Sequence, residues 1–348
     1  FSIWQGHGRD VAPVETARFS YRLPRDLIAK YPLPRGTSRL LVVDRRSGDL
    51  THRRFSDIIT YLNPGDVLVL NDTRVIRARL LGKKETGGAA EVFLLRELGP
   101  ARWSCLIRTS KRMRTGMRVV FDGNLSACVE ECAGNEYVVS LSDPVRILEQ
   151  GKMPLPPYLE RDAEESDVRA YQTVYARHDG SVAAPTAGLH FTMEMLAGIS
   201  SRGVSVVPVT LHVGTGTFLP VRTERIEDHV MHSEDYAVSK EAARLIEQAR
   251  RERRRIVAVG TTVTRVLEHL MQVCGRIEQG KGSTDIFIHN GFSFQAVGAM
   301  ITNFHLPCST LLMLASAFAG HELIMKAYEE AIQKRYRFFS YGDTMLII

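Results

Sequence analysis

The hydrophobic pattern of the chain changes twice, and this change most constrains how the chain can fold. Between about residues 75 and 141, short runs rich in β-forming residues alternate with glycine-containing turns, without helical periodicity. Such spacing is typical of a small antiparallel barrel or sandwich. On both sides of this region, helical and strand patterns alternate, which indicates an α/β fold. The pattern therefore predicts an α/β domain of residues 19–74 and 145–348 with an inserted β-domain of residues 75–144.

The α/β region divides into elements of ordinary length. Before residue 75 we expect strands at 40–44, 50–54 and 67–70 and a short helix at 57–62. In the second half we expect helices at 193–202, 240–254, 263–273, 310–319 and 322–334, and strands at 204–213, 256–259, 285–288 and 296–302.

Composition sets the class of protein. With 44% hydrophobic and 24% charged residues, the 348-residue chain is typical of a soluble protein with room for two domains. Its five cysteines form no Cys-x-x-Cys pair, which argues against a disulfide or zinc framework and favours the cytoplasm. No apolar run reaches the length of a membrane span. Residues 1–18 lack an initiator Met and are interpreted as an extension or cloning remnant.

The net charge of +6 has two interpretations. It is compatible with a polyanionic partner such as nucleic acid, and also with mere solvation of the surface. The run at residues 250–255 contains five arginines and one glutamate. It fits either a solvated helix end or a phosphate contact.

Two glycine-containing blocks indicate a small-molecule site. The first, at residues 183–192, contains His190 and Thr192, and the second, at residues 211–218, contains His212, Gly214 and Gly216. Glycine lets backbone N–H groups approach a ligand closely, and histidine can move protons near neutral pH. Together the blocks favour an enzyme.

Further candidates follow predicted strands. Thr261 and Thr262 lie at a helix start, where they either bind an anion or only cap the helix. Asn303 and His305 lie at a strand end, where α/β folds place their sites. Ser309 is expected to cap the next helix.

The remaining candidates are open to two interpretations each. Asp285 is expected to orient an imidazole or to act as a turn residue, and Asp72 and Arg74 lie in either a turn or a cleft between the domains. Arg265 and Glu268 either bind substrate or form an i,i+3 surface pair. His229 and His232 have helical spacing but lack the further ligands of a zinc site, so we expect no metal.

These motifs occur in the order of a known family. The chain resembles the S-adenosylmethionine:tRNA ribosyltransferase-isomerases of queuosine biosynthesis from about residue 19 to 348. The resemblance depends on blocks at residues 71–76, 184–192, 211–218, 260–268, 284–288, 302–313 and 338–343. The family usually has proline where this chain has Arg77, and a Tyr-Pro-Gly-Tyr-like turn at residues 289–292, so local loop geometry is expected to differ there.

The resemblance implies an activity and an architecture. Such an enzyme transfers and isomerises the ribosyl part of S-adenosylmethionine onto 7-aminomethyl-7-deazaguanine at the wobble position of a tRNA with a GUN-type anticodon. Epoxyqueuosine forms, and adenine and methionine are released. S-adenosylmethionine is a co-substrate, and no cofactor or metal is expected. The implied fold is an α/β barrel-like domain with an inserted antiparallel β-barrel, and we expect a monomer.

The implied chemistry suggests roles for the candidates. His190, His212 and His305 are candidates for proton transfer, and Asp72 and Asp285 for orienting or cation-facing acids. Thr261 and Thr262 are expected to hold the methionine carboxylate. The other expected substrate-binding residues are Arg74, Thr192, Gly214, Gly216, Thr217, Arg265, Glu268, Asn303 and Ser309.

Two other functions compete with this interpretation. Gly214 and Gly216 after a strand resemble a methyltransferase loop, although such a loop is expected after the first strand of the fold. The basic composition alone would suit a non-catalytic tRNA-binding protein. For the implied ribosyltransferase-isomerase, we expect a basic cleft between the domains that binds the anticodon arm mainly through phosphate.

Overall fold

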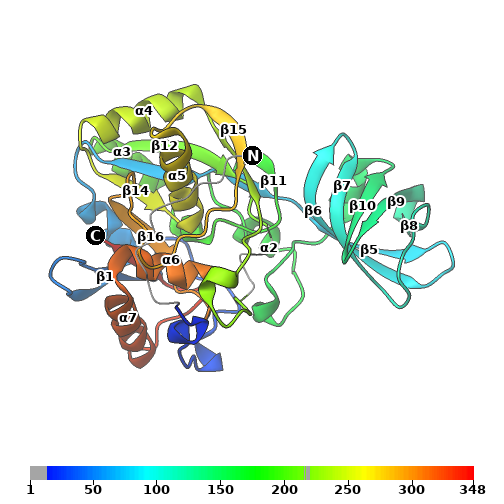
Figure 1. Cartoon of the computed structure of the whole chain (residues 1–348), viewed down its shortest axis with the longest axis horizontal. Helices are drawn as coiled ribbons and strands as arrows, with labels where there is room; N and C mark the ends of the chain where they lie inside the picture. Colours follow the sequence, from blue (N-terminus) through cyan, green and yellow to red (C-terminus); the bar gives the residue numbers. More distant parts are fainter. Residues whose placement is uncertain (1–13, 215, 217–219) are drawn as a thin grey trace.

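The structure, a computed structural model, describes residues 14–214, 216 and 220–348. The described strands form a nine-stranded sheet, a closed six-stranded barrel and a two-stranded sheet. Figure 1 shows the barrel to one side of a larger body that contains the nine-stranded sheet. The two-stranded sheet pairs β4 (Thr73–Val75) with β11 (His178–Ser181).

The nine-stranded sheet is mixed. Its order is β15 (Gly280–Thr284), β13 (Glu234–Val238), β12 (Ser205–Leu211), β3 (Val67–Asn71), β14 (Ile256–Val259), β16 (Ala299–Asn303), β17 (Thr344–Ile347), β1 (Arg39–Val43) and β2 (Leu50–Arg54). The neighbours β12, β3, β14 and β16 are parallel. The two edges of the sheet are β15 and β2, so the barrel-like form that the resemblance implied for this domain is not seen.

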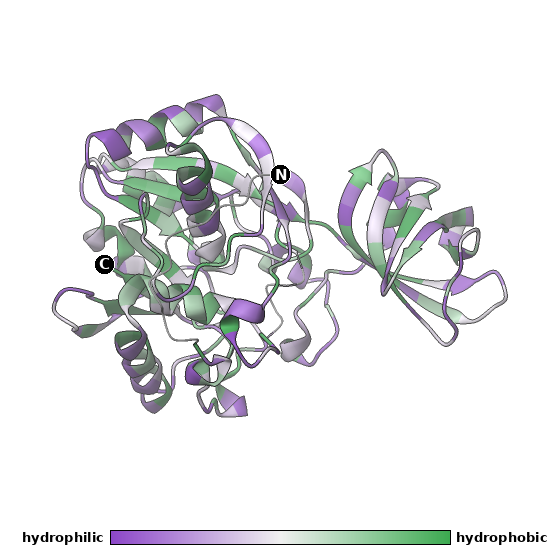
Figure 2. Ribbon diagram, viewed as in Figure 1, coloured by the Kyte–Doolittle hydropathy of each residue, from purple (hydrophilic) through white to green (hydrophobic). Residues whose placement is uncertain are grey.

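Helices cover both faces of this sheet. Val67 and Val69 of β3 share a core with Ile246 of α4 (Lys240–Arg251), whereas Leu68 and Leu70 share one with Ile199 of α3 (Met193–Ser201). Burial on both faces explains the continuous apolar run of this strand. Figure 2 shows the corresponding contrast between hydrophobic central strands and the mainly hydrophilic helix α4.

The helices lie between and after these strands. The α-helices are α1 (Pro144–Gln150), α2 (Asp167–Ala170), α3 (Met193–Ser201), α4 (Lys240–Arg251), α5 (Thr261–Cys274), α6 (Thr310–Ala319) and α7 (His321–Gln333). The 3-10 helices are η1 (Thr16–Phe19), η2 (Arg25–Leu27), η3 (Phe55–Tyr61), η4 (Asp122–Asn124), η5 (Pro157–Leu159), η6 (Thr186–His190) and η8 (Ile226–Asp228).

The barrel confirms the predicted small antiparallel β-structure. It contains β5 (Arg79–Lys84), β6 (Ala89–Gly99), β7 (Arg102–Thr109), β8 (Arg118–Phe121), β9 (Leu125–Ala133) and β10 (Glu136–Leu141). Leu80, Val92 and Val119 belong to its separate core. Pairing of β9 with β10 closes the barrel and removes its edges. The domain boundaries at residues 75 and 144 stay predictions, because strand pairing does not fix where a domain begins.

Several element predictions are confirmed and one is wrong. The strand at 256–259 and the helix at 310–319 are found with the expected bounds. The strand expected at 285–288 is not found. The strand in this region is β15, which pairs with β13. Ile286 and Ile288 lie in the loop after β15, and their side chains are buried. None of the helices in the described ranges is long and apolar enough to cross a membrane.

Candidate functional site

The carboxyl ends of the four parallel strands meet at one edge of the main sheet and bring several predicted blocks together. Asn71 ends β3 and Asp72 follows it, His212 follows β12, Gly260 follows β14, and Asn303 ends β16. In α/β sheets this edge is the usual place for a ligand site. Asn71 joins two of these strands, because its amide donates to Leu211 O (3.0 Å) and accepts from Leu211 N–H (3.0 Å).

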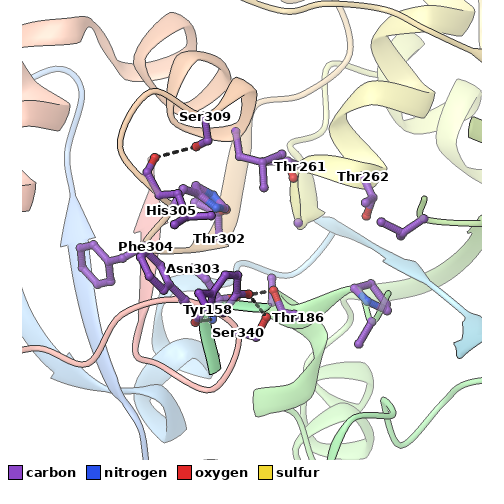
Figure 3. A pocket seen from close by; sticks show the side chains of 18 residues that line it. Tyr158, Thr186, Thr261, Thr262, Thr302, Asn303, Phe304, His305, Ser309 and Ser340 are labelled. Carbon is purple, nitrogen blue, oxygen red and sulfur yellow. Dashed lines mark hydrogen bonds between the residues drawn. The ribbon is translucent and has the colours of Figure 1, made fainter. Parts of the chain in front are cut away.

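A pocket lies at this edge and is here named the inner pocket. Figure 3 shows polar side chains from several separate segments around it. Its polar lining comprises Tyr158, Thr186, Thr261, Thr262, Thr302, Asn303, His305, Ser309 and Ser340.

The N-terminus of α5 lines one side of the inner pocket. The helix begins at Thr261, two residues earlier than predicted, so Thr262 lies inside the first turn and the alternative that it only caps the helix is wrong. The cap residue is Gly260, whose φ of +93° favours glycine. The first N–H groups of a helix lack partners within it and carry partial positive charge. This end of α5 is therefore suited to a carboxylate.

His305 lines the opposite side of the inner pocket, as Figure 3 shows. Its Nε2 lies 2.7 Å from Thr302 Oγ1, and its backbone N–H donates to the Tyr328 hydroxyl (2.8 Å). Burial lowers the pKa of His305 to about 3, so the ring is neutral at pH 7. Ser309 caps α6, as predicted, by accepting from Leu312 N–H, and it also lines the pocket.

His190 lies behind the inner pocket. Its Nδ1 is 2.8 Å from Ser38 Oγ, and its Nε2 is 3.3 Å from the Asn303 amide nitrogen. These contacts fit a neutral imidazole that donates from Nδ1 and accepts at Nε2. Burial lowers the pKa of His190 to about 3. His190 lines a separate cavity and contacts a lining residue of the inner pocket, Asn303.

His212 faces a different space, here named the outer groove. Successive residues of an extended chain point to opposite faces, and accordingly Val213 lines the inner pocket while His212 lines the groove. His212 Nδ1 lies 2.8 Å from Thr73 Oγ1, and burial lowers its pKa below the ordinary value. The structure therefore separates the three predicted histidines into three different spaces.

Asp72 also lines the outer groove. Its buried carboxylate accepts from the Thr210 hydroxyl (2.7 Å) and lies 3.6 Å from His178 Nε2. The ionisable residues that line the groove carry both signs of charge, namely Asp72, Asp179, Asp235, Arg177, His178, His212, Lys240 and Lys281. The groove is lined by three acids and by one arginine and two lysines, so it has no excess of positive charge.

Arg265 and Glu268 are buried, so the alternative of a surface pair is wrong. Arg265 forms an ion pair with Glu234 of β13, and Glu268 accepts from the N–H groups of Gln295 (2.8 Å), Ala296 (3.1 Å) and Val297 (2.9 Å). Neither residue lines the inner pocket. Both hold segments around it in place.

The structure places the other candidates away from the inner pocket. Thr192 caps α3 by accepting from Met195 N–H (3.1 Å), and Arg74 is exposed beside Asp179 (3.8 Å). Asp285 is exposed in a loop, not at a strand start, and lines neither space. Gly214 N–H donates to Glu234 (3.0 Å).

Gly216 and the arginine run at 250–255 do not line the inner pocket. Gly216 lies so close to His232 that a Cβ would meet its ring at 2.6 Å, whereas Thr217 lies outside the described residues. In the run at 250–255, Arg250 and Arg251 pair with Glu247, Arg254 with Glu252, and Arg255 with Asp66. These ion pairs favour the interpretation as a structural helix end.

Sequence reasoning missed Tyr158 as a lining residue. Its hydroxyl lies 2.5 Å from Ser340 Oγ, which ties the segment after α1 to the C-terminal segment. Ser340 belongs to the block at 338–343 that supported the resemblance, and this block was the only signal for that side of the pocket.

Burial of His190 and His305 predicts a pH-dependent stability. Each folded-state pKa of about 3 lies below the ordinary value near 6.5, so between these values the unfolded chain binds more protons. Stability should therefore fall as the pH is lowered, by about 2 kcal/mol per histidine between pH 6.5 and 5. Denaturant titrations at the two pH values should show a weaker pH dependence for His190→Gln and His305→Gln than for the exposed control His52→Gln. Equal dependence in all variants would contradict this.

Comparison with known proteins identifies the family to which this chain belongs. The family described as queuosine biosynthesis protein matches residues 16–347. The S-adenosylmethionine:tRNA ribosyltransferase-isomerase of Symbiobacterium thermophilum is 53% identical over 338 residues, with 95% of this chain and 98% of the relative covered. That of Pelobacter propionicus is 51% identical over 337 residues, with 94% and 98% covered.

A solved structure agrees with this. The crystal structure of S-adenosylmethionine tRNA ribosyltransferase from Thermotoga maritima is 37% identical, with a TM-score of 0.55, and the alignment covers 95% of this chain and all of that chain. The chain therefore has the fold of a class of tRNA-modifying enzymes. This fold combines an α/β part, with a pocket at the edge of its sheet, and a β-barrel. The chain belongs to the S-adenosylmethionine:tRNA ribosyltransferase-isomerase family of queuosine biosynthesis.

Proposed function

We propose that this protein transfers and isomerises the ribosyl group of S-adenosylmethionine onto 7-aminomethyl-7-deazaguanine in tRNA. The product is epoxyqueuosine-tRNA, and adenine and methionine are released. The observation that carries this function is family membership over nearly the whole chain, with about half of the residues identical in relatives of that activity.

We propose the inner pocket as the S-adenosylmethionine site. The N-terminus of α5 supports this placement, because Thr261 and Thr262 offer hydroxyl and N–H donors to the methionine carboxylate. Asn303 lies within reach of the same ligand, and its Oδ1 already accepts from the Thr186 hydroxyl (3.3 Å). The ribose and adenine would then lie toward His305, Phe304 and Phe339, which line the pocket.

The reaction needs a base, because the sulfonium acidifies the adjacent C5′ hydrogens of the ribose. Removal of one proton lets adenine leave, and the amine of the deazaguanine then bonds to a ribosyl carbon and gives up a proton. An oxygen finally displaces methionine and closes the epoxide. A proton-transfer group is most effective when its pKa lies near the working pH. We assign His305 to hydrogen bonding as a neutral imidazole, and His212, which is less buried, to proton exchange at the groove.

Asp72 is the proposed contact for the amine of the RNA. The aminomethyl group of the deazaguanine is a cation at neutral pH, and Asp72 is a buried carboxylate on the wall of the outer groove. The base must leave its stack to be reached, as in other enzymes that act on a nucleobase. We further propose a monomer that acts in the cytoplasm on GUN-type anticodons, and domain boundaries at residues 75 and 144.

The products of S-adenosylmethionine turnover test this function. With tRNA that carries the deazaguanine precursor, we expect adenine and methionine in equal amounts, and no turnover with tRNA that lacks the precursor. Chromatography of the small molecules distinguishes the alternatives. S-adenosylhomocysteine would indicate a methyltransferase, and binding of tRNA without consumption of S-adenosylmethionine would indicate a non-catalytic protein.

A further inference from the structure

One end of the barrel carries a concentration of positive charge that the proposed site does not use. Residues 108–118 contain five Lys or Arg residues and no acid. Four of them, together with Lys84 from the end of β5, line a hollow, here named the barrel-end surface. Its basic residues are Lys84, Lys111, Arg112, Arg114 and Arg118, and Glu85 is the acid that lines it.

These five cations have no acidic partner in the described part of the chain. Lys111, Arg112, Arg114 and Arg118 are exposed, and none of the five takes part in an ion pair there. Arg112 donates instead to the backbone oxygen of Gly134 (2.5 Å).

Other arginines of the protein differ in this respect. Arg102, on the same barrel, contacts both Glu130 (2.7 Å) and Glu131 (2.5 Å). Arg79, near the start of the barrel, contacts Glu91 (2.9 Å) and Asp162 (3.0 Å). Most of the arginines at 250–255 are paired as well. The barrel-end surface thus brings five unpaired cations together on one hollow, where their charge is available to a partner.

The register of the barrel places this surface away from the larger body. Arg79 of β5 bridges to Lys152, where the chain returns to that body, whereas Lys84 ends the same strand. Lys84 is five residue steps further along the strand than Arg79, which corresponds to roughly 17 Å. Figure 1 shows the far ends of β5 and β8 directed away from the nine-stranded sheet.

We infer that the barrel-end surface binds the sugar–phosphate backbone of the tRNA at a position outside the anticodon stem-loop. This inference rests on the proposed function. Unpaired Arg and Lys side chains are the usual phosphate contacts, and they supply affinity without sequence specificity. The outer groove carries both signs of charge and so supplies little net attraction for RNA. The barrel end supplies that attraction and fixes the orientation of the RNA, while the groove receives the modified base.

Binding as a function of salt tests this inference. We compare Lys111→Gln/Arg112→Gln/Arg114→Gln with a control, Arg46→Gln/Arg53→Gln/Lys326→Gln, which removes the same charge from exposed positions of the larger body. Each lost phosphate contact should lower the slope of log affinity against log salt by about 0.7–0.9. For full-length tRNA we therefore expect a slope lower by roughly 2–3 and affinity weaker by at least about tenfold. The control should bind like the wild-type protein.

A second RNA makes the test specific. An isolated anticodon stem-loop of the same sequence should bind the triple variant and the wild-type protein equally. Equal losses with both RNAs would overturn the inference, because the contact would then lie within the stem-loop. An unchanged slope with full-length tRNA would also overturn it, and would leave an acidic protein as the fitting partner.

Two further measurements separate this inference from other failures. In adenine release with full-length tRNA, the triple variant should need a higher tRNA concentration for its half-maximal rate than the control variant does. If the wild-type protein itself releases no adenine, the proposed function fails, whereas the salt slope still reports on the RNA contact. If the triple variant does not fold, Lys84→Gln/Arg118→Gln serves as a second test, because it removes two cations of the same surface that lie on β5 and β8. This variant should lower the slope by roughly 1–2.

Discussion

The His305→Ala variant is expected to release adenine from S-adenosylmethionine about 10²-fold more slowly than the wild-type protein in the presence of precursor tRNA. Of the three histidines predicted from the sequence, His305 is the one that lines the inner pocket. Loss of a positioned proton-transfer or hydrogen-bonding group commonly costs this factor. The KM for S-adenosylmethionine should change much less, because a contact made mainly in the transition state adds little ground-state binding. Single-turnover adenine release measures the effect directly.

Controls separate this effect from misfolding. His305→Gln keeps a hydrogen-bonding group beside Thr302 and should retain more activity than His305→Ala. The exposed His52 lies on β2, at an edge of the sheet, and His52→Ala should behave like the wild-type protein. Because the pKa of His305 is about 3, its ionisation should produce no change in rate between pH 6 and 8. Wild-type turnover by folded His305→Ala would remove His305 from the mechanism.

The sequence predicted elements best where local signals agreed. A buried apolar run predicted β14, and the Ser309 cap with apolar residues after it predicted α6. Strand β15 could not be predicted in this way. Its sequence, Gly-Lys-Gly-Ser-Thr, has little β-propensity, and it is a strand because it pairs with β13 at the edge of the sheet. Distant pairing of this kind is not visible in local periodicity.

The candidate site, too, could be predicted only where local signals were sufficient. The strand end before Asn303 and His305 predicted a site there, because α/β folds place their sites at the carboxyl ends of strands. The local pattern could not reveal that His190, His212 and His305 face three different spaces. That separation depends on which side of each segment is covered by the rest of the chain, and hence on packing between residues more than 100 positions apart.

Arg265 illustrates a residue whose role became clear only from such packing. An i,i+3 spacing to Glu268 suggested that the two residues act together, but Arg265 pairs with Glu234 of β13, and the two side chains are 6% and 4% exposed. The guanidinium also donates to Ile286 O (3.3 Å). Glu234 in turn accepts from Gly214 N–H (3.0 Å), so the ion pair connects α5, β13 and the glycine block after β12.

Arg265→Met should therefore destabilise the protein by about 3–5 kcal/mol, because it removes the guanidinium that forms a buried ion pair with Glu234. For a body of this size, the expected fall in melting temperature is roughly 6–15 °C. Arg265→Met/Glu234→Gln should be more stable than Arg265→Met, since the double change removes the buried charge and keeps an acceptor for Gly214 N–H. Calorimetry of both variants and of the exposed control Arg244→Met measures the difference. If the double variant melts below Arg265→Met, the charge of Glu234 is not the cause, and the lost packing of the arginine side chain is the larger effect.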